Sequence, residues 1–364
     1  MVLYDSHTDS PSQLIRLRNM GIDNPLAQQD FPKMRRGGVS GSFFALYTPA
    51  SFAPDQATRY ALEMVSAVYD AVDENPDYAA LAYSPEEARE NAGKGLMSLF
   101  LGMENGAPIQ ESLPLLRTFY RLGVSYVTLT HNGDNALADS AAEGTRWGGL
   151  SPFGRSVVKE MNSLGMMIDL SHASDATFWD CIKLSQAPVI CSHSCCRALC
   201  GHRRNLTDEM LQVLGEKDGY VGINFYPAFL SDDFGKKTAD AALLDEADAV
   251  EARFIEEPWN PVRVRAWLQV QERMQSELWR PGVEAVADHI DHAVKMAGIT
   301  HVGIGTDFDG ITVGPKGLED ISKMGALWDE LRRRGYSETD IERISGLNLM
   351  DVFQRVIDCS ESMR

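Results

Sequence analysis

The chain alternates short apolar runs with longer amphipathic stretches along most of its length. The short runs are rich in Val, Ile, Leu, Tyr and Phe, which is typical of buried parallel strands, and the stretches between them repeat apolar residues at helical spacing. Eight strands are predicted, at Val2–Ser6, Gly41–Leu46, Gly95–Leu101, Tyr126–Thr130, Met166–Leu170, Pro188–Ser192, Tyr220–Phe225 and His301–Gly305. The clearest predicted helices are Gln56–Tyr69, Ile109–Leu122, Pro152–Leu164, Ala173–Leu184, Thr207–Leu214 and Val283–Met296.

Eight strand and helix units in alternation predict an α/β fold, a closed (β/α)8 TIM barrel. Two helix starts carry the expected signals. Ser151 precedes Pro152, which suits a cap followed by a first-turn proline. Thr207 stands before two acidic residues, whose charges favour a helix N-terminus.

The alternation of strands and helices is interrupted after the seventh predicted strand. The segment Leu230–Leu278 is interpreted as a long insertion there, and the chain from Leu318 onward is predicted to form three closing helices. No linker rich in Gly, Ser and Pro divides the chain, and no short repeat is evident. We therefore expect residues 1–364 to form one domain.

Composition narrows the classes of partner. With 34 basic and 52 acidic residues, the formal charge is −18, so the surface should repel nucleic acid and anionic membranes. No apolar run reaches the roughly 18 to 20 residues that span a bilayer, and the end of the chain, Ser362–Arg364, carries no apolar anchor signal. We expect a soluble, cytoplasmic protein; a periplasmic or exported location stays open for a chain from which a signal peptide was removed.

Five of the six cysteines lie within twenty positions, which suggests either a disulfide or zinc cluster or a set of ordinary thiols. The spacing of Cys195, Cys196 and Cys200 lacks the paired Cys-x-x-Cys pattern of structural zinc sites. A 364-residue globule does not need disulfides to stabilise its core. Ordinary buried thiols are therefore expected.

Ionisable side chains gather where the predicted strands end, on the side where a β/α barrel builds its active site. Seven candidates share this position: His7, Asp9, Glu104, His131, His172, His193 and Asp307. The other histidines, His202, His289, His292 and His301, fall in helices or before a strand, and are expected to be surface or packing residues.

His7 and Asp9 are two positions apart, so an extended strand directs both to one face. Alone, this pair is more often a polar strand-end loop. Four imidazoles and three carboxylates together would be costly to bury without partners, and a divalent cation binds neutral imidazoles and ionised carboxylates alike. A metal site is therefore predicted.

The other candidates have alternative interpretations as well. Glu104 lies between glycines and could be a turn acid, while His172 and His193 could simply bond to the backbone. Their strands are neighbours, however, and adjacent imidazoles favour a pair of ligands. Of the two aspartates in the Asp307-Phe308-Asp309-Gly310 turn, catalysis is assigned to Asp307 and a structural role to the other.

Several longer motifs make the pattern specific. They are Asp5-Ser6-His7-Thr8-Asp9, Gly102-Met103-Glu104-Asn105-Gly106, Thr128-Leu129-Thr130-His131-Asn132, Gly165 to His172, Ser192-His193-Ser194, Arg203-Arg204-Asn205 and Gly303 to Gly310. Through them the chain resembles, almost end to end, the membrane (renal) dipeptidases and their bacterial relatives in the amidohydrolase superfamily. The resemblance implies a (β/α)8 barrel with two divalent metal ions, expected to be Zn²⁺, bound by His7, Asp9, Glu104, His172 and His193. It also implies that Glu104 bridges the two ions.

The resemblance further implies the roles of the remaining residues. A hydroxide shared by the metals attacks the peptide carbonyl, Asp307 handles its proton, His131 meets the developing oxyanion, and Arg204 holds the free carboxylate of the substrate. Asn224 and Tyr226 line the pocket edge in this comparison, but Tyr226 is equally compatible with packing. Relatives are often dimers, so a homodimer is a further expectation.

The expected function is that of a zinc-dependent dipeptidase for dipeptides with a free C-terminal carboxylate, extending to L-Xaa-D-Xaa as in relatives. The alternative is another binuclear amidohydrolase, such as an N-acyl-amino-acid hydrolase. Many of those bridge their metals with a carboxylated lysine after strand four, whereas the carboxylate here is Glu104 after strand three. The third hypothesis is a non-catalytic barrel used for binding. Such a protein should have lost some of the metal-ligating residues, yet none of them is missing from this sequence. The insertion Leu230–Trp267 is expected to influence which side chains are accepted.

Overall fold

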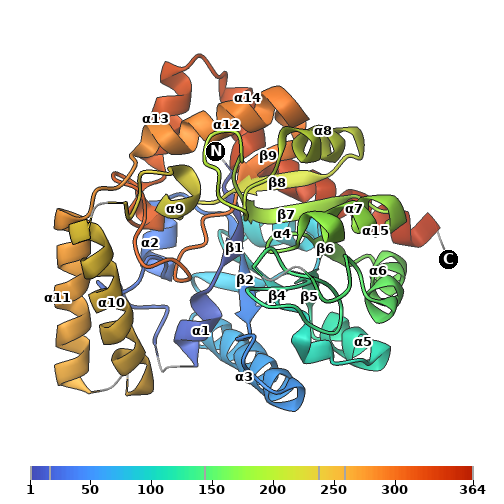
Figure 1. Cartoon of the computed structure of the whole chain (residues 1–364), viewed down its shortest axis with the longest axis horizontal. Coiled ribbons are helices and arrows are strands. Elements are labelled where there is room, and N and C mark those ends of the chain that lie inside the picture. Colours follow the sequence, from blue (N-terminus) through green and yellow to red (C-terminus); the bar gives the residue numbers. More distant parts are fainter. Residues whose placement is uncertain (1, 16–17, 143–144, 237, 258–259, 363–364) are drawn as a thin grey trace.

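The computed structural model describes the chain except residues 1, 16–17, 143–144, 237, 258–259 and 363–364. The last two residues, considered above for a membrane anchor, therefore lie outside the described part. Eight parallel strands form a nearly closed barrel surrounded by helices, which confirms the predicted TIM barrel (Figure 1). In spatial order they are β1 (Tyr4–Thr8), β2 (Gly41–Tyr47), β4 (Met97–Glu104), β5 (Val124–Thr128), β6 (Met167–Asp169), β7 (Val189–Ser194), β8 (Tyr220–Ile223) and β9 (Val302–Ile304).

One further strand lies outside this ring and was not predicted. β3 (Ala79–Leu81) pairs with the first residues of β4, from Met97 to Leu99, whereas β5 pairs with β4 only from Leu101 onward. β3 thus covers the part of β4 that β5 leaves open. Three residues are too few to show a period, which is why the sequence pattern did not reveal this strand.

The first and last strands meet at their C-terminal ends. The Asp9 amide donates to the Phe308 carbonyl at 2.9 Å, and the Asp307 amide donates to the His7 carbonyl at 3.1 Å. Buried Asp5 accepts from the Thr306 amide at 2.9 Å and also from its hydroxyl. These bonds close the barrel and fix the two segments that bear candidate ligands against each other.

The helices around the barrel agree with most predicted positions. Ser151 and Thr207 cap their helices, because their hydroxyls accept from the amides of Gly154 and Met210. The helix predicted from Ile109 begins later, because Ser112 caps it and Ile109 belongs to a separate turn. The elements are α1 (Ser10–Leu14), α2 (Phe31–Arg36), α3 (Pro54–Asp73), α4 (Pro85–Gly93), η1 (Ala107–Ile109), α5 (Leu113–Arg121), α6 (Pro152–Leu164), α7 (Asp175–Leu184), α8 (Asp208–Glu216), α9 (Pro227–Leu230), α12 (Val283–Ala297), η2 (Ile299–His301) and η3 (Ile321–Lys323).

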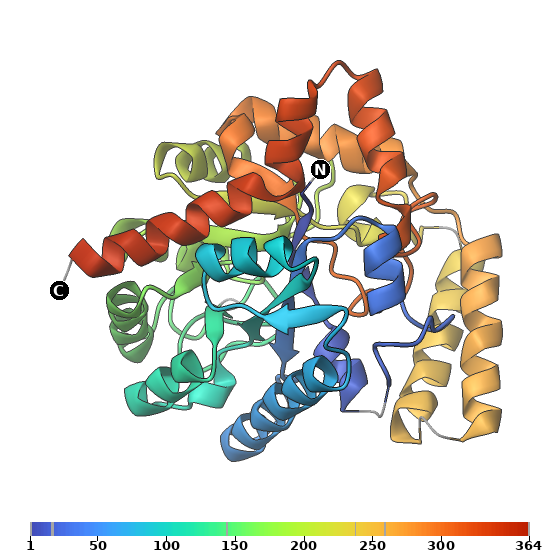
Figure 2. The same cartoon turned by 180° about the vertical axis from the view of Figure 1, so that it is seen from behind.

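The three predicted C-terminal helices are present, and the last one covers one end of the barrel (Figure 2). They are α13 (Gly325–Arg333), α14 (Glu338–Glu342) and α15 (Asn348–Ser362), with η4 (Arg343–Leu347) joining the last two. Phe353 of α15 packs on Phe43 and Phe100 inside the barrel, with ring centroids 6.0 and 5.9 Å apart. The N-terminal end of the barrel is therefore filled by apolar side chains, which leaves the opposite end for polar chemistry.

The segment after β8 is an insertion, as predicted. Its main elements, α10 (Thr238–Glu256) and α11 (Pro261–Glu277), form a helical pair beside the barrel (Figure 1). The pair has its own small core, in which Trp267 and Met274 pack with Val313 from the loop after β9. The α10–α11 pair therefore packs against the loop after β9, at the mouth of the barrel.

All six cysteines are free, which confirms the expectation of ordinary thiols. Neighbouring Cys195 and Cys196 even point to different partners, the carbonyls of Asn224 at 3.2 Å and His289 at 3.3 Å. In the part of the chain that the structure describes, no helix is both long and apolar enough to cross a membrane.

Candidate metal centre

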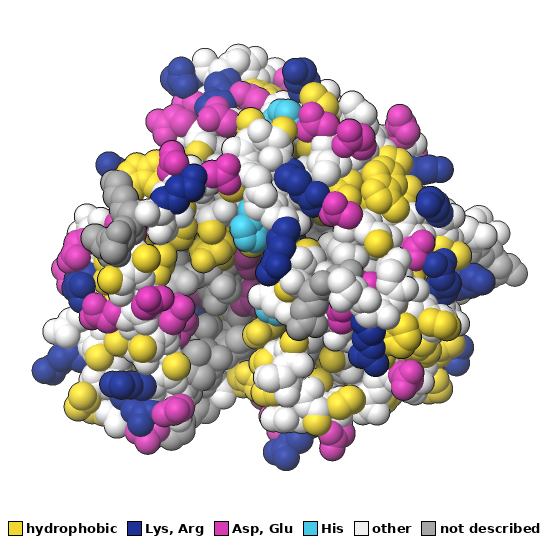
Figure 3. Space-filling view, in the orientation of Figure 1, with side chains coloured by type: hydrophobic (Ala, Val, Ile, Leu, Met, Phe, Trp, Pro, Cys, Tyr) yellow, Lys and Arg dark blue, Asp and Glu magenta, His cyan; other side chains and the backbone are white. Residues whose placement is uncertain are grey.

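All seven ionisable residues selected from the sequence lie at the same mouth of the barrel. His7, Glu104 and His193 sit at the ends of β1, β4 and β7, while His131 and His172 follow β5 and β6 by three residues. Asp9 and Asp307 complete the group from the joined ends of β1 and β9. A cavity of about 360 Å³ opens there, and Figure 3 shows a hollow on this face with histidine and acidic side chains around it.

Glu104 lies between the two groups of candidate ligands. Its Oε1 is 3.1 Å from His172 Nε2 and 3.5 Å from His193 Nε2. Its Oε2 is 3.7 Å from His7 Nε2, which in turn lies 3.7 Å from Asp9 Oδ2. One carboxylate therefore presents each oxygen to a different set of ligand atoms.

Several buried atoms of this cluster lack a partner. His7 Nε2, His193 Nε2 and Asp9 Oδ1 make no hydrogen bond to any described atom. Leaving such atoms unpaired costs roughly 1 to 3 kcal/mol each. Burial, and then the charge of Glu104, raise the pKa of Asp9 to about 6. A divalent cation would satisfy the three atoms and offset the crowding of negative charge.

The Nδ1 atoms of two of these imidazoles have hydrogen-bond partners on the side away from the cluster. His7 Nδ1 lies 2.8 Å from the Tyr126 hydroxyl, and His193 Nδ1 lies 2.8 Å from the Ser192 hydroxyl. Because the Ser192 hydroxyl donates to Asp169 at 2.6 Å, it accepts from His193 Nδ1. That bond leaves the lone pair of His193 Nε2 facing the cluster, the orientation that a metal ligand requires.

Backbone strain concentrates at the same mouth. His172 and Asp307 have φ values of 67° and 62°, and Asn105, directly after Glu104, has 74°. Such conformations cost of order 1 kcal/mol or more for a residue with a side chain. A Cβ on Gly310 would lie 2.0 Å from Asp9 Oδ2, so this glycine lets the chain approach the carboxylate closely.

The two aspartates of the β9 loop have different surroundings. Asp307 accepts from the Asn224 amide at 2.9 Å, and burial together with Asp9 raises its pKa to about 7. Asp309 instead accepts from Ser10 at 2.7 Å, from Arg18 at 3.0 Å and from the backbone amide of residue 28 at 2.9 Å. Asp309 therefore ties segments together, whereas Asp307 faces the cluster.

His131 and Arg204 lie beside the carboxylates. The His131 ring packs against His172 at a centroid distance of 4.3 Å, and burial together with Arg204 lowers its pKa to about 3, so it is neutral. Arg204 is only 6% exposed. Its Nη2 donates to the His193 carbonyl at 3.2 Å, its Nε has no partner, and it forms no ion pair with the described residues. The guanidinium is thus buried, with no carboxylate at ion-pair distance among the described residues.

The sequence of the whole chain, residues 1–364, matches the family model described as membrane dipeptidase, peptidase family M19. The chain belongs to this family. Among curated relatives, dipeptidase aclJ of Aspergillus oryzae is 35% identical over 350 residues, which cover 94% of this chain and 73% of aclJ. Membership confirms the resemblance drawn from the motifs, establishes a peptide-bond hydrolase and implies a divalent metal.

Solved structures agree with this membrane dipeptidase assignment. The probable dipeptidase PvdM of Pseudomonas aeruginosa superposes with a TM-score of 0.83 at 28% identity, covering 99% of this chain and 96% of PvdM. A metallo peptidase of Rhodobacter sphaeroides, liganded with a phosphinate mimic of the dipeptide L-Ala-D-Ala, gives 0.80 at 26% identity, covering 98% and 99%.

The histidines expected to play no part in this M19 site lie in other surroundings. His289 is buried between the Cys196 amide and the Leu230 carbonyl, and His292 pairs with an aspartate on α8. His301 contacts the carbonyl of residue 219, and the His202 ring packs on Phe229 in a tilted arrangement, with centroids 4.6 Å apart. In the described part of the chain, none of the four belongs to a group that could hold a metal.

Sequence reasoning missed the residues that support the candidate metal ligands of this dipeptidase. Tyr126 was recognised only as a strand residue, although its hydroxyl meets His7, and Ser192 only as a strand end and as part of a motif, although its hydroxyl meets His193. Asn132, which lies 3.2 Å from His172 Nδ1, likewise received no role. Ser192 and Asn132 stand next to predicted ligands in the sequence, and that was the available signal; Tyr126 and Asn132, however, contact imidazoles that are 119 and 40 residues away.

Proposed function

We propose that this protein is a dizinc dipeptidase that hydrolyses dipeptides with a free C-terminal carboxylate, including L-Xaa-D-Xaa. The placement of Glu104 carries the proposal, because its two oxygens face separate sets of histidines. The phosphinate mimic of L-Ala-D-Ala in the Rhodobacter structure supports the extension to a D-residue.

The residues present fit two cations. His7, Asp9 and Glu104 would hold one, and Glu104, His172 and His193 the other; this mixture of imidazole and carboxylate donors suits Zn²⁺. When bound, such a pair of cations would lower the pKa of a water molecule and polarise the scissile carbonyl. Hydrogen bonds between the Nδ1 atoms of His7 and His193 and the hydroxyls of Tyr126 and Ser192 hold the two imidazoles in the orientation needed for metal binding.

The remaining residues act on the substrate. Asp307 accepts the proton of the attacking water and delivers it to the leaving amine, a transfer for which a carboxyl group with a pKa near 7 is suited. Neutral His131 donates an N–H to the carbonyl oxygen as negative charge develops there. Arg204 supplies the counter-ion for the C-terminal carboxylate, since its buried guanidinium forms no ion pair with the described residues.

Metal analysis and a substrate panel test the proposal. Protein purified without chelator should contain about two zinc ions and hydrolyse L-L and L-D dipeptides. Activity only on N-acyl amino acids would rule out the dipeptidase and leave the metal site intact.

The residue roles are tested by two carboxylate-to-amide substitutions. Asp307→Asn should keep both metals and lose most turnover, whereas Glu104→Gln should lose metal as well. Asp70→Asn, at an exposed position of α3, is the matched control. Full activity of Asp307→Asn would contradict the assigned proton transfer.

A further inference from the structure

Asn224, directly after β8, lies behind the proposed proton carrier Asp307. Asn224 is fully buried, so its side chain cannot contact a substrate directly. Asp307, in contrast, is partly exposed and lines the cavity of the metal centre. The Nδ2 atom of Asn224 donates to Asp307 Oδ2 at 2.9 Å. Asn224 therefore meets this carboxylate from the interior of the protein, on the side away from the cavity.

The backbone of Tyr226 fixes the orientation of the Asn224 amide. The Tyr226 backbone amide donates to Asn224 Oδ1 at 2.6 Å. Because a backbone N–H can only donate, the atom that it meets is the side-chain oxygen, and the NH2 group is turned toward Asp307. That NH2 group can also only donate, so Asp307 Oδ2 remains an acceptor. A proton carried by Asp307 is therefore directed to its other oxygen, Oδ1.

The Oδ1 atom of Asp307 lies beside the candidate metal ligands. A Cβ built on Gly310 would be 2.8 Å from Asp307 Oδ1 and 2.0 Å from Asp9 Oδ2, so these two oxygens border the same small volume. In the described part of the chain, no amide, guanidinium or alcohol donates to Asp307 Oδ1. Oδ1 is therefore the oxygen that is left to exchange a proton.

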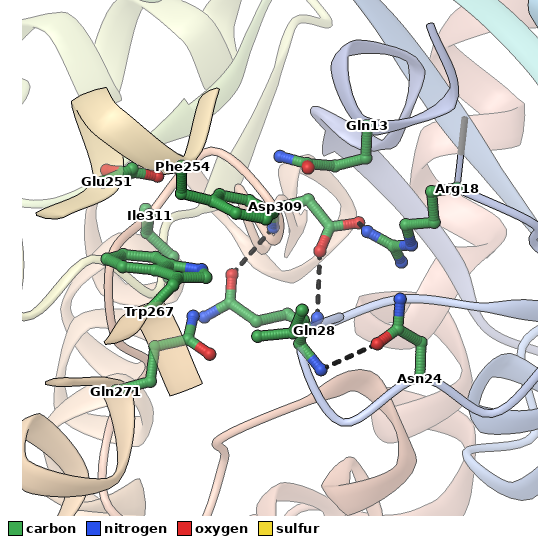
Figure 4. Close-up of a pocket in the computed structure, with 11 residues that line it drawn as sticks. Gln13, Arg18, Asn24, Gln28, Glu251, Phe254, Trp267, Gln271, Asp309 and Ile311 are labelled. Atoms are coloured by element: carbon green, nitrogen blue, oxygen red, sulfur yellow. Dashed lines mark hydrogen bonds and ion pairs between the residues drawn. The ribbon is translucent and has the colours of Figure 1, made fainter. Parts of the chain in front are cut away.

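Asp309, in the same loop after β9, has the opposite arrangement (Figure 4). Its Oδ1 accepts from the backbone amide of Gln28 at 2.9 Å. Its Oδ2 accepts from Arg18 at 3.0 Å and from Ser10 at 2.7 Å. Both oxygens of Asp309 are thus occupied, which suits a carboxylate that joins segments of the chain. The donor on Asp307 holds that side chain and leaves one of its oxygens for chemistry.

We propose that Asn224 is a positioning residue for the proton transfer: it fixes the Asp307 carboxylate so that Oδ1, and not Oδ2, carries the proton. The attacking water bonds through its oxygen to the carbonyl carbon and gives one proton to Oδ1. Oδ1 then passes this proton to the amide nitrogen, the C–N bond breaks, and Asp307 is a carboxylate again. This inference rests on the dipeptidase function proposed above.

The test separates the two hydrogen bonds of the Asn224 side chain. In Asn224→Ser the hydroxyl can still accept from the Tyr226 amide, as serine does in such turns, but it is too short to reach Asp307. With zinc-loaded enzyme and L-Ala-L-Ala, kcat should fall about 10- to 100-fold, the usual effect of a hydrogen bond to a charged group. KM should change by less than about threefold. Zinc content should equal that of the wild type, because neither side-chain bond involves a proposed ligand.

A second substitution covers the case in which Asn224→Ser folds poorly. Asn224→Leu has nearly the shape of asparagine but no donor, so it should lower kcat to a similar extent. Asn19→Ser is the matched control. Asn19 is exposed, and its Oδ1 accepts from the Gly21 amide at 2.8 Å, which is the same bond to the residue two positions later. Its kcat should equal that of the wild type.

A double variant tests whether Asn224 acts through Asp307. In Asp307→Asn the proton carrier is already absent, so adding Asn224→Ser should change the residual kcat by less than about threefold. A residue that merely supported the fold would lower kcat in both backgrounds.

Several results would overturn the inference. If the wild type hydrolyses no dipeptide, the proposed function fails and the inference fails with it. If the wild type is active and both Asn224 variants keep its kcat, only the inference fails. A rise in KM at unchanged kcat would assign Asn224 to substrate binding, and a loss of zinc would assign it to the metal site. An equal loss of kcat in the wild-type and Asp307→Asn backgrounds would show that Asn224 acts independently of Asp307.

Discussion

Gly102→Ala should weaken metal binding, because the added methyl group would displace the ring of Tyr126. Gly102 pairs with Tyr126 across β4 and β5. A Cβ at Gly102 would lie 2.1 Å from Cζ of the Tyr126 ring, whereas ordinary contacts begin at 3.4 Å. The tip of the ring must therefore move by at least the difference, about 1.3 Å.

That movement bears directly on the metal centre. The Tyr126 hydroxyl is 2.8 Å from His7 Nδ1, and a displacement of this size away from His7 takes it out of hydrogen-bond range. Phe43 stacks on the ring at 5.6 Å, so little free space is available. Losing such a partner behind a ligand typically lowers metal affinity about 10- to 100-fold, and overpacking costs about 1 to 3 kcal/mol. For 364 residues this corresponds to a fall in Tm of about 1 to 4 °C.

Competition with a chromophoric chelator measures the zinc affinity, and a thermal melt of the metal-free protein measures the packing cost separately. Tyr126→Phe removes the hydroxyl but keeps the ring, so it should lower affinity with a smaller change in Tm. Gly93→Ala is the matched control, because a Cβ there meets no atom within 4 Å. Unchanged zinc affinity in Gly102→Ala would refute the reasoning.

Three further outcomes are expected. Removing metal with a chelator should abolish hydrolysis and lower Tm, because zinc at 1,000 times its Kd contributes about 4 kcal/mol of stability; an unchanged melt would contradict bound metal. Arg204→Met should lower kcat/KM for L-Ala-L-Ala about 10- to 100-fold and barely affect its C-terminal amide, and an equal loss on both substrates would argue against carboxylate binding. Zinc affinity should fall as the pH falls, because the pKa of His7 is raised well above its ordinary value and that of Asp9 is raised to about 6, and both protons must leave before metal binds; chelator competition with equal affinity at pH 5 and 7 would disprove this.

The strand ends could be located from sequence because each strand is a short apolar run, and the residue after such a run points to the mouth of a barrel. That rule brought together His7, Glu104 and His193, and the structure places both histidines beside the Glu104 carboxylate. It could not find Arg204, which lies in a loop ten residues beyond β7 and was named only through the family resemblance.

The contacts that support the candidate ligands could not be predicted from the sequence, for a different reason. Tyr126 meets His7 across 119 positions, and Arg18 meets Asp309 across 291. Such pairs depend on register and on loop geometry, which hydrophobic periodicity does not encode. The same limit applies to β3, whose three residues match only the first part of β4.

The hydrogen bonds that close the barrel join residues that are synthesised at very different times. Thr306, the partner of Asp5, lies 301 residues later in the chain, and a ribosome adding 5 to 20 residues per second needs roughly 15 to 60 seconds to reach it. Until then β1 has a neighbour on one side only, and Asp9 lacks Asp307. For most of its synthesis the nascent chain therefore carries candidate metal ligands without the segment that closes the barrel, so a divalent metal ion can enter the complete site only after translation has passed β9.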